Sequence, residues 1–411
     1  MIALATLWWI RFAVTIGGWT LPVAAGAWSP EPRPVVALGT TGTAVYATPA
    51  RGRPIGLLRP GAVLPLLEVR PAADCPSDWL RIGDAAWICA PAAARGEDTA
   101  RPRRWPPAPP PGSPLPFLYV HPLGRGREIY PTVAAAVERR AGVPFPPGHW
   151  ESVEAEIRRG GVALYRTVSG RYLRADDVRW AAPTPLAGLP LDPGDAPWPW
   201  GFTFAASTPV YREPPAARRA EPAPRAPRLP RHAVVRVEEA SERWVRIGPA
   251  RYLRRDDVRL FRRQPRPDGV GPTERWLDVD LAEQLLAAYE GDVPRFATPI
   301  SAGRGGLTRE GSFRIYRAAG TQTMRGPLTG DGGRTYTVHD IPWVLFFDED
   351  RALHAAFWHV EFGTARSHGC INLPPAAAAW VFDFAGPRLP DGWQWIEPPD
   401  RNDGTLVLVH R

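Results

Sequence analysis

The stretch Ser367–Asn372 reads SHGCIN, and the stretch His354–His359 shortly before it reads HAAFWH. Three of the eight histidines fall between His354 and Cys370, where an even distribution would place only about 0.3. A cysteine nucleophile needs a base for its proton, backbone N–H groups for the developing oxyanion, and an acid for the leaving amine. Nearby imidazoles, and a glycine that permits close backbone approach, provide all three. The pattern predicts acyl transfer through a thioester on Cys370.

Two other interpretations of these residues stay open. In the first, the histidines are structural groups and Cys370 is a small buried side chain. In the second, the three histidines and the cysteine bind zinc. Zinc is disfavoured because the chain has no C-x-x-C pair, and because an odd spacing would place His354 and His359 on opposite faces of a strand. We therefore predict neither a metal nor a cofactor.

The sequence around the cluster predicts a mainly β domain. Alternation of apolar and polar residues runs through 276–281 and 311–316, and residues 341–347 form a strongly apolar strand-like run. Only residues 376–384 have the composition of a clear helix.

The SHGCIN block, with His354 sixteen residues before the cysteine, resembles the signature of the L,D-transpeptidase catalytic domain family. The resemblance extends over 273–399 and includes the family's Thr-Pro-x-Gly-x-Phe turn at 308–313, where Arg309 replaces the proline. It implies a C-terminal β-sandwich enzyme that crosslinks peptidoglycan stem peptides, needs no cofactor and is acylated by carbapenems.

The resemblance also implies a role for each matched residue. Cys370 would attack the carbonyl of the third stem residue, and His354, oriented by a backbone carbonyl near Ala355, would take and return the proton. The N–H groups of Gly369 and Cys370, with His368 alongside, would line the oxyanion hole. The remaining matched residues would hold the loop or flank the acyl-donor pocket: Ser367, Asn372, Met324 and Tyr336.

Three questions stay open at this level. His359 is either an alternative base or a substrate contact, although its spacing to Cys370 favours His354 as the base. The acyl acceptor is either an amine, which makes a transpeptidase, or water, which makes an L,D-carboxypeptidase or endopeptidase. The third alternative is a non-catalytic wall-binding protein, which the intact histidine and cysteine set disfavours.

Upstream segments repeat one another. Trp79–Gly83 (WLRIG) aligns with Trp244–Gly248 (WVRIG) at a shift of 165 residues, and 171–179 aligns with 251–259 at a shift of 80. Each unit ends in two alternating strands joined by a glycine-containing turn, a pattern typical of a β-hairpin. The repeats resemble bacterial SH3-like units, which are small β-barrels. We predict such units at 34–92, 117–182 and 199–262, with a Pro/Arg-rich linker at 93–116.

Composition limits the class of protein and its partners. The 411 residues include 51 prolines and 39 glycines, which argue against an all-helical chain, and a hydrophobic fraction of 44% excludes a fully disordered one. All 50 basic residues are arginine and the net charge is +8, so anionic partners are favoured. We expect an anionic cell-wall polymer at the SH3-like units and no nucleic acid, because no nucleic-acid-binding signature is present. We also expect a monomer.

The N-terminal residues 1–27 resemble an export signal, either cleaved or retained as a membrane anchor. Arg11 precedes an apolar run at 12–25, and small residues follow it. Cys75 and Cys89 lie in one predicted unit and would be free to pair in an oxidising compartment, which would leave Cys370 unpaired. The sequence therefore predicts export to the periplasm or cell envelope.

Overall fold

The computed structural model describes residues 42–89, 106–191, 199–214, 227–327 and 335–411 in full. It also describes the backbone of four strands, β1 (Thr15–Ile16), β2 (Trp19–Thr20), β3 (Arg33–Ala37) and β10 (Ala94–Asp98). The predicted export signal at 1–27 lies outside the described residues, apart from β1 and β2. The described part of the chain is mainly β, as predicted, and contains no helix both long and apolar enough to span a bilayer.

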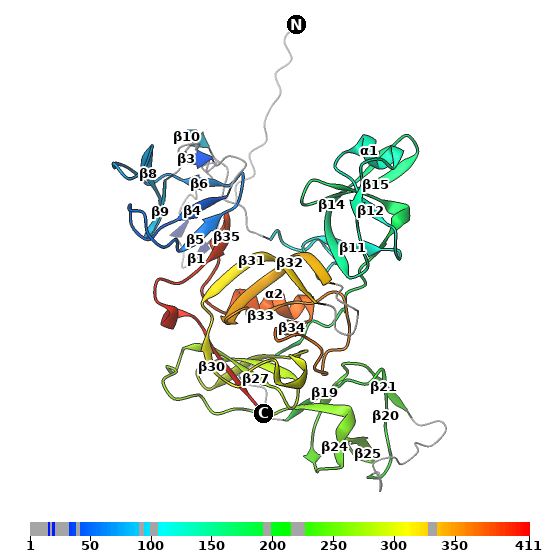
Figure 1. Cartoon of the computed structure of the whole chain (residues 1–411). Helices are drawn as coiled ribbons and strands as arrows, with labels where there is room; N and C mark the ends of the chain where they lie inside the picture. Colours follow the sequence, from blue (N-terminus) through cyan, green and yellow to red (C-terminus); the bar gives the residue numbers. More distant parts are fainter. Residues whose placement is uncertain are drawn as a thin grey trace.

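The C-terminal domain is built on two sheets with a common core (Figure 1). The first sheet has the order β18-β29-β28-β27-β36-β30. Its strands are β18 (Leu189–Pro190), β27 (Arg275–Asp280), β28 (Leu285–Glu290), β29 (Val293–Pro299), β30 (Gly311–Arg314) and β36 (Leu406–His410).

The second sheet carries the long antiparallel hairpin β31–β32. Its C-terminal-domain strands are β31 (Arg317–Pro327), β32 (Thr335–Asp348), β33 (Arg351–Ala355), β34 (Ile371–Leu373) and β35 (Trp393–Ile396). The predicted helix is α2 (Pro375–Phe384), which packs on β32 and β33. Proline in its first turn suits the start of a helix, because the missing N–H has no intrahelical partner there.

Strand β28 of the first sheet is apolar at nearly every position, without the usual alternation. Leu286 and Ala288 face the main core between the sheets, whereas Leu285, Ala287 and Tyr289 face a second cluster that includes Phe202 and Phe261 of the unit at 199–262. Alternate residues of a strand point to opposite faces, so a strand buried on both faces needs apolar residues throughout.

The predicted C-terminal boundary at residue 399 was too early. Strand β36 pairs in parallel with β27 and antiparallel with β30, so it lies inside the first sheet. Val407 and Val409 are almost fully buried in the main core. The apolar run in β36 is only four residues long and follows a polar turn, so it is a weak strand signal. Its place in the sheet depends on pairing with residues of β27, about 130 positions away.

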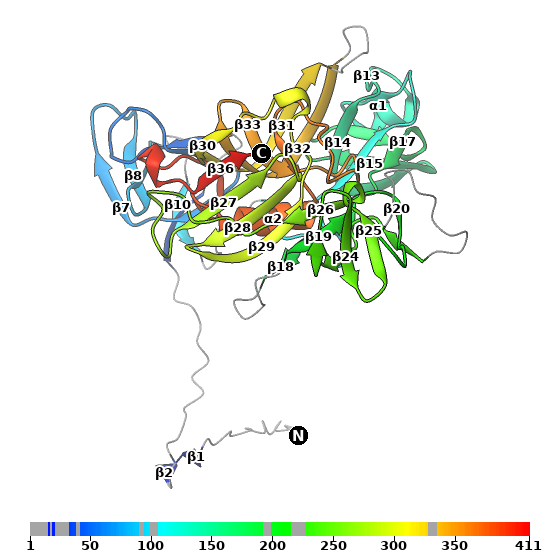
Figure 2. The same ribbon diagram turned by 90° about the horizontal axis from the view of Figure 1, so that it is seen from below.

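The units at 34–92 and 117–182 join the C-terminal domain by strand pairing, and the unit at 199–262 packs on it through Phe202 and Phe261. Strand β5 (Gly56–Leu58) pairs with β35, β14 (His149–Arg159) pairs in parallel with β32, and β18 pairs with β29. A single path of strands, β16-β15-β14-β32-β31-β35-β5-β4, therefore runs from the unit at 117–182 to the unit at 34–92. Figures 1 and 2 show the three units placed around the C-terminal domain.

The predicted hairpins at the ends of the units are confirmed. They are β8–β9 (Asp78–Gly83 and Ala86–Cys89), β15–β16 (Val162–Thr167 and Tyr172–Arg174) and β24–β25 (Trp244–Gly248 and Arg251–Arg254). In each unit an isolated antiparallel bridge ties the hairpin to an upstream tyrosine: Tyr46 to Trp87, Tyr130 to Tyr172, and Tyr211 to Tyr252. The repeat is thus structural, but the pairings do not close a barrel among the described strands, and the SH3-like interpretation stays a prediction.

The other strands of the units are short. In the first unit they are β4 (Thr43–Val45), β6 (Val63–Pro65) and β7 (Glu68–Pro71). In the second they are β11 (Leu118–Pro122), β12 (Glu128–Ile129), β13 (Val143–Pro144) and β17 (Val178–Trp180), with a helix α1 (Val133–Glu138). In the third they are β19 (Trp200–Thr203), β20 (Ser207–Pro209), β21 (Arg228–Pro230), β22 (Val234–Arg236), β23 (Glu239–Ala240) and β26 (Val258–Phe261).

The structure bears on two further expectations for the upstream region, the pairing of Cys75 with Cys89 and the linker at 93–116. Cys75 and Cys89 form a disulfide, and the cysteine left unpaired is Cys370. The segment at 93–116 is not only a linker, because β10 pairs with β3 and because Leu115 is buried in the main core. The segment was interpreted as a linker from its prolines and arginines, which do not report these non-local contacts.

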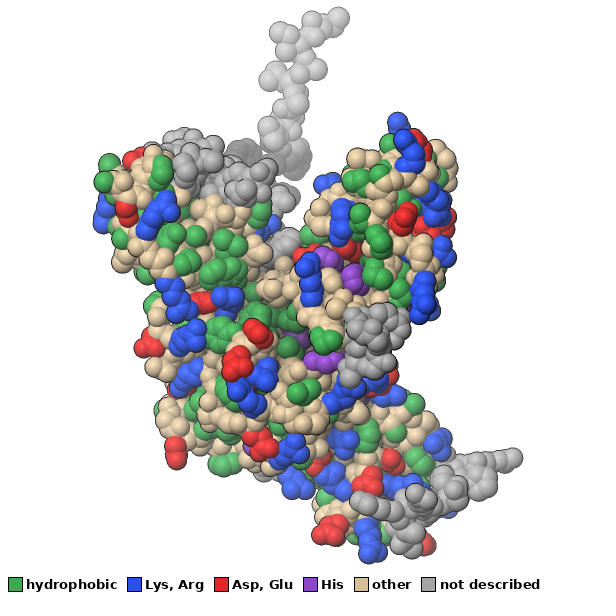
Figure 3. Space-filling view, in the orientation of Figure 1, with side chains coloured by type: hydrophobic (Ala, Val, Ile, Leu, Met, Phe, Trp, Pro, Cys, Tyr) green, Lys and Arg blue, Asp and Glu red, His purple; other side chains and the backbone are tan. Residues whose placement is uncertain are grey.

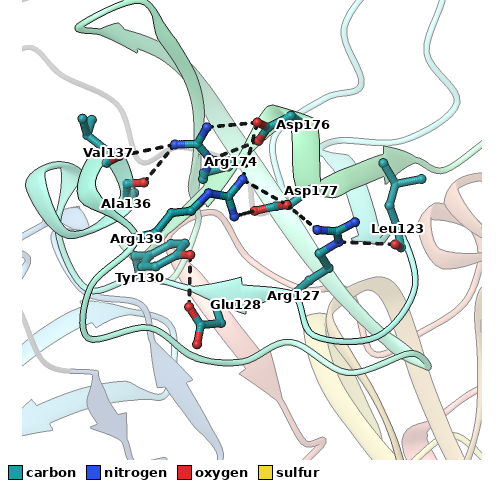
Figure 4. A network of polar contacts seen from close by, with 10 residues as sticks. All are labelled: Leu123, Arg127, Glu128, Tyr130, Ala136, Val137, Arg139, Arg174, Asp176 and Asp177. Carbon is teal, nitrogen blue, oxygen red and sulfur yellow. Dashed lines mark hydrogen bonds and ion pairs between the residues drawn. The ribbon is translucent and has the colours of Figure 1, made fainter.

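A buried carboxylate organises the unit at 117–182 (Figure 4). The Asp177 side chain is 2% exposed and accepts hydrogen bonds from Arg127 Nη1 at 3.1 Å and Arg139 Nη1 at 2.9 Å. Next to it, Arg174 Nη1 donates to the Ala136 carbonyl at the end of α1, at 3.3 Å. A buried charge is tolerated only when it is paired, so Asp177 requires both arginines.

We expect Asp177→Ala to lower the stability of this unit by about 3 kcal/mol, because it removes two charge-assisted hydrogen bonds that contribute about 1.5 kcal/mol each when the cations are half-exposed. Asp176→Ala is the matched control, since the Asp176 side chain is 59% exposed and its ion pair with Arg174 should contribute less than about 1 kcal/mol. Hydrogen exchange of the amides of β15 and β16 measures both effects. Equal protection in the two variants would contradict the role of Asp177.

Candidate active site

The residues predicted to act together line one cleft of about 850 Å³. The cleft is bounded by β31, β32, the end of β33 and the loop before β34. The predicted residues that line it are Met324, Tyr336, His354, His359, Ser367, His368, Cys370 and Asn372. Gly369 is the one predicted site residue that is not among the lining residues.

The pairing of β33 with β34 brings the cysteine and the histidine together. The two strands are parallel, with Leu353 opposite Ile371 and His354 opposite Asn372. Cys370 immediately precedes β34, and its Sγ lies 3.9 Å from the Asp350 carbonyl oxygen. The pairing therefore brings His354 of β33 and Cys370, the residue before β34, to one end of the cleft, although the sequence separates them by sixteen residues.

His354 is held in one orientation. Its Nδ1 lies 2.9 Å from the Ala355 carbonyl oxygen, the backbone contact that the sequence analysis predicted. A carbonyl only accepts hydrogen bonds, so Nδ1 carries the proton and Nε2 keeps its lone pair. The side chain is buried, and this burial lowers the pKa of His354 to about 4, so the imidazole is neutral at pH 7.

Cys370 is the free cysteine of the chain and lies partly exposed in the cleft. Burial of the sulfur raises its pKa above the ordinary value near 9, and a hydrogen bond from the Ala352 backbone and the charge of Arg351 offset this only in part. The resting site therefore holds a neutral thiol beside a neutral imidazole. Proton transfer must accompany nucleophilic attack.

The loop before the cysteine is closed by its own polar groups. Ser367 Oγ donates to the Cys370 carbonyl and accepts from the Gly369 N–H at 3.0 Å. This contact corrects the expectation that the Gly369 N–H lines an oxyanion hole, because that N–H is already engaged. Gly369 adopts a φ of +137°, and a Cβ there would lie 3.2 Å from the Leu307 carbonyl oxygen, so the position requires glycine.

His359 lies beyond the end of β33 and not on a strand with His354, so the prediction that the two occupy opposite strand faces was wrong. Its Nε2 lies 3.1 Å from Asn372 Nδ2, and its buried Nδ1 makes no hydrogen bond. Burial lowers the pKa of His359 to about 4 as well. Asn372 thus holds His359 with its side chain, and its backbone pairs with Ser301.

The hairpin β31–β32 supplies the wall above the thiol. The Tyr336 ring stacks on His368, with 5.7 Å between ring centroids and 22° between planes. Met324 lies on the neighbouring strand, opposite Val338. Tyr336 and Met324 therefore face the cleft from adjacent strands, as the resemblance implied.

An ion-pair cluster braces the turn beside the thiol. Buried Asp348 accepts from Arg309 Nε at 2.9 Å and from Arg351 Nη1 at 3.2 Å. Arg351 Nε also donates to the Leu307 carbonyl at 2.8 Å. Arg309, which departs from the family pattern, thus helps to hold the turn that carries the Asp350 carbonyl.

Other lining residues were not predicted from the sequence. Gly148 immediately precedes β14 and Trp150 lies in it, in the unit at 117–182. No local signal marks them, because their place in the cleft depends on the pairing of β14 with β32. Among the described residues, no group of three or more His, Cys, Asp or Glu side chains is placed to hold a metal ion.

Residues 274–409 match the family model of the L,D-transpeptidase catalytic domain, also called YkuD. The match begins at β27 and ends in β36, and it confirms the resemblance found in the sequence. No curated protein is found to match the chain.

Several solved structures are similar to part of the chain. A variant of the Enterococcus faecium L,D-transpeptidase is 23% identical over 34% of this chain and 50% of its own, with a TM-score of 0.26. The NMR structure of the E. faecium catalytic domain is 25% identical over 34% of this chain and 98% of its own, with a TM-score of 0.26. A Mycobacterium smegmatis L,D-transpeptidase is 20% identical over 43% and 82%, with a TM-score of 0.27. This chain thus spans about half the length of the first of these proteins.

We expect the thiol of Cys370 to remain protonated at pH 7 and to titrate only above pH 9, because burial raises its pKa. Thiolate absorbance at 240 nm measures this, taken as the difference between the wild type and Cys370→Ala so that tyrosine ionisation cancels. Thiolate absorbance already present at pH 6 would contradict the neutral pair and indicate a preformed thiolate–imidazolium pair.

Proposed function

We propose that this protein, which carries an L,D-transpeptidase catalytic domain at 274–409, is a peptidoglycan L,D-transpeptidase with Cys370 as its nucleophile. The acyl donor is a stem peptide whose third residue acylates Cys370 through its carbonyl as the terminal D-Ala leaves. The acceptor is the side-chain amine of another stem peptide. The reaction crosslinks the cell wall.

One observation carries this proposal. His354 of β33 and Cys370, which immediately precedes the paired strand β34, line the same cleft, and the Ala355 carbonyl leaves His354 Nε2 as the available base. His359 is a weaker candidate for the base, because its Nε2 is occupied by Asn372. We therefore assign the base to His354 and a positioning role to His359.

The reaction starts from a neutral Cys370 thiol and a neutral His354 imidazole. His354 Nε2 takes the thiol proton as Sγ forms a bond to the donor carbonyl carbon. The tetrahedral intermediate collapses, the bond to D-Ala breaks, and the imidazolium returns its proton to the leaving amine. The acceptor amine then attacks the thioester, His354 accepts its proton, and the thiolate leaves and regains a proton.

Stabilisation of the oxyanion falls to fewer groups than the sequence implied. The Gly369 N–H is engaged by Ser367, which leaves the Cys370 N–H and the His368 side chain for this role. Tyr336 stacks on His368 and limits the orientations of its ring. Met324 and Tyr336 flank the donor, and Asn372 with Ser367 holds the loop.

Hydrolysis is the second candidate. If water replaces the amine, the same acyl-enzyme makes an L,D-carboxypeptidase or endopeptidase. A non-catalytic wall-binding protein is the third. We favour transfer because the family model that matches residues 274–409 is that of the L,D-transpeptidase catalytic domain.

The rest of the proposal concerns location and partners. The disulfide between Cys75 and Cys89 supports an oxidising compartment, so we propose an exported, monomeric protein of the periplasm or cell envelope, with residues 1–27 as its signal or anchor. The units at 34–92, 117–182 and 199–262 would then bind an anionic wall polymer through their arginines.

We expect meropenem to add one covalent adduct to the full chain, detected by intact-mass spectrometry. Cys370→Ala should give no adduct, because the other two cysteines form a disulfide. His354→Ala should slow the addition by about 100-fold or more, as loss of a general base does. Muropeptide analysis then separates crosslinked dimers from trimmed monomers.

His359→Ala is the matched control, since His359 lines the same cleft and has a similarly lowered pKa. Its effect should be smaller than that of His354→Ala. A larger effect would reverse the two assignments. A wild-type protein that reacts with a small alkylating agent but never with meropenem or a tetrapeptide donor would overturn the proposed function.

A further inference from the structure

Two residues of the cleft lie outside the catalytic domain. Gly148 and Trp150 line it together with Met324, Tyr336 and Val338, yet they belong to the unit at 117–182, where Gly148 precedes β14 and Trp150 lies in it. The family match begins only at residue 274, so this part of the wall lies outside the matched domain.

Strand pairing fixes the place of Trp150 relative to the donor wall. Trp150 pairs with Val338 and His149 with Thr337, and the Thr337 N–H donates to the Gly148 carbonyl at 3.3 Å. Strands of one sheet lie about 4.8 Å apart, so the Trp150 backbone lies about 5 Å from β32 and about 10 Å from β31. Met324, Val338 and Trp150 thus follow one another across three strands.

The indole has a fixed orientation. Its ring meets the Phe357 ring edge to face, with 5.5 Å between centroids and 80° between planes, and it lies 4.4 Å from the His121 ring. Phe357 is itself stacked on Tyr119 at 3.8 Å. A Trp that packing already orders loses little conformational entropy when a ligand binds against it.

A buried polar junction below Trp150 keeps the unit docked. Across the junction with β32, the Ser152 hydroxyl donates to the Asp340 side chain, and His339 Nε2 lies 3.5 Å from Glu151 Oε1. The Tyr119 hydroxyl donates to the Asp340 carbonyl at 2.6 Å. Separating the two domains would leave these buried groups without partners, which is costly.

The space-filling view agrees with this arrangement. Histidine side chains gather on the face drawn in Figure 3 both at the centre of the molecule and where the upper-right unit meets the C-terminal domain. The junction and the cleft therefore open on the same side of the protein.

We propose that Trp150 is a substrate-binding residue that the unit at 117–182 contributes to the acyl-donor side of the cleft, where it selects for an extended stem peptide. The inference rests on the proposed function, because the donor defines which wall Trp150 extends. The indole packs against a part of the donor other than the third stem residue, whose carbonyl forms the thioester. It does not take part in the chemistry at Cys370.

The test compares Trp150→Ala with Trp150→Phe in the full chain. Trp180→Ala is the matched control, because Trp180 lies in the same unit, is 39% exposed and does not line the cleft. We expect Trp150→Ala to raise KM for a disaccharide-tetrapeptide donor about tenfold, the scale on which truncated aromatic anchors weaken binding. The rate at which iodoacetamide alkylates Cys370 should stay within about twofold of the wild-type rate, because the indole takes no part in the chemistry at Cys370. A change of that size is far smaller than the effect expected on KM from the loss of an aromatic anchor.

Trp150→Phe should recover most of the lost affinity, and Trp180→Ala should have the KM of the wild type. A Trp150→Ala KM equal to that of the wild type would overturn the inference. Equal KM increases in Trp150→Ala and Trp180→Ala would also overturn it, since they would indicate general damage to the unit.

Binding of the tetrapeptide to Cys370→Ala, measured by calorimetry with and without Trp150→Ala, separates this inference from the proposed function. If the wild type forms no crosslinks but binding still depends on Trp150, the proposed function fails and the binding site stands. If crosslinks form and binding ignores Trp150, the inference fails alone.

Discussion

The parallel pairing of β33 with β34 is the constraint on which the site depends. It places His354 opposite Asn372 and sets Cys370 at the start of β34. Because side chains alternate along a strand, a shift of one residue in this pairing would turn the side chain of either His354 or Asn372 away from the cleft. The burial of Leu353 and Ile371 in the main core fixes that register, since their only favourable position is against α2 and the first sheet. Catalytic geometry is thus a consequence of core packing.

Edge strands explain how the upstream units are held. A sheet edge with unpaired N–H and C=O groups invites non-specific pairing, and proteins cover such edges. Here β5 covers β35, β14 pairs with β32, and β18 covers β29. The units at 34–92 and 117–182 are therefore structural parts of the second sheet, whereas the unit at 199–262 packs against the first sheet through side chains. The hairpin β31–β32 gains a third strand at the cleft, which gives a wall that a two-stranded hairpin alone would hold poorly.

The local part of this structure was readable in the sequence and the non-local part was not. The SHGCIN block and its spacing to His354 predicted a cysteine and a histidine that line one cleft, with the Ala355 contact, because these features lie within twenty residues. The terminal strand β36, the engaged N–H of Gly369 and the contribution of Trp150 were missed or misassigned. Each depends on a strand pairing or a hydrogen bond whose partner cannot be recognised from the adjacent residues in the sequence. Repeats were found because similarity at a fixed shift is itself a sequence signal, whereas their docking edges carry none.

The neutral state of the site also bears on where the protein works. A thiolate is the form of cysteine that oxidants attack, and susceptibility follows thiolate character and exposure. Burial raises the pKa of Cys370, while Cys75 and Cys89 are joined in a disulfide in the same chain. A protein that we propose is exported must keep one thiol reduced where two others are oxidised. Holding that thiol protonated until a donor carbonyl arrives lets His354 generate the nucleophile only during the reaction, so the burial that lowers resting reactivity also protects the site.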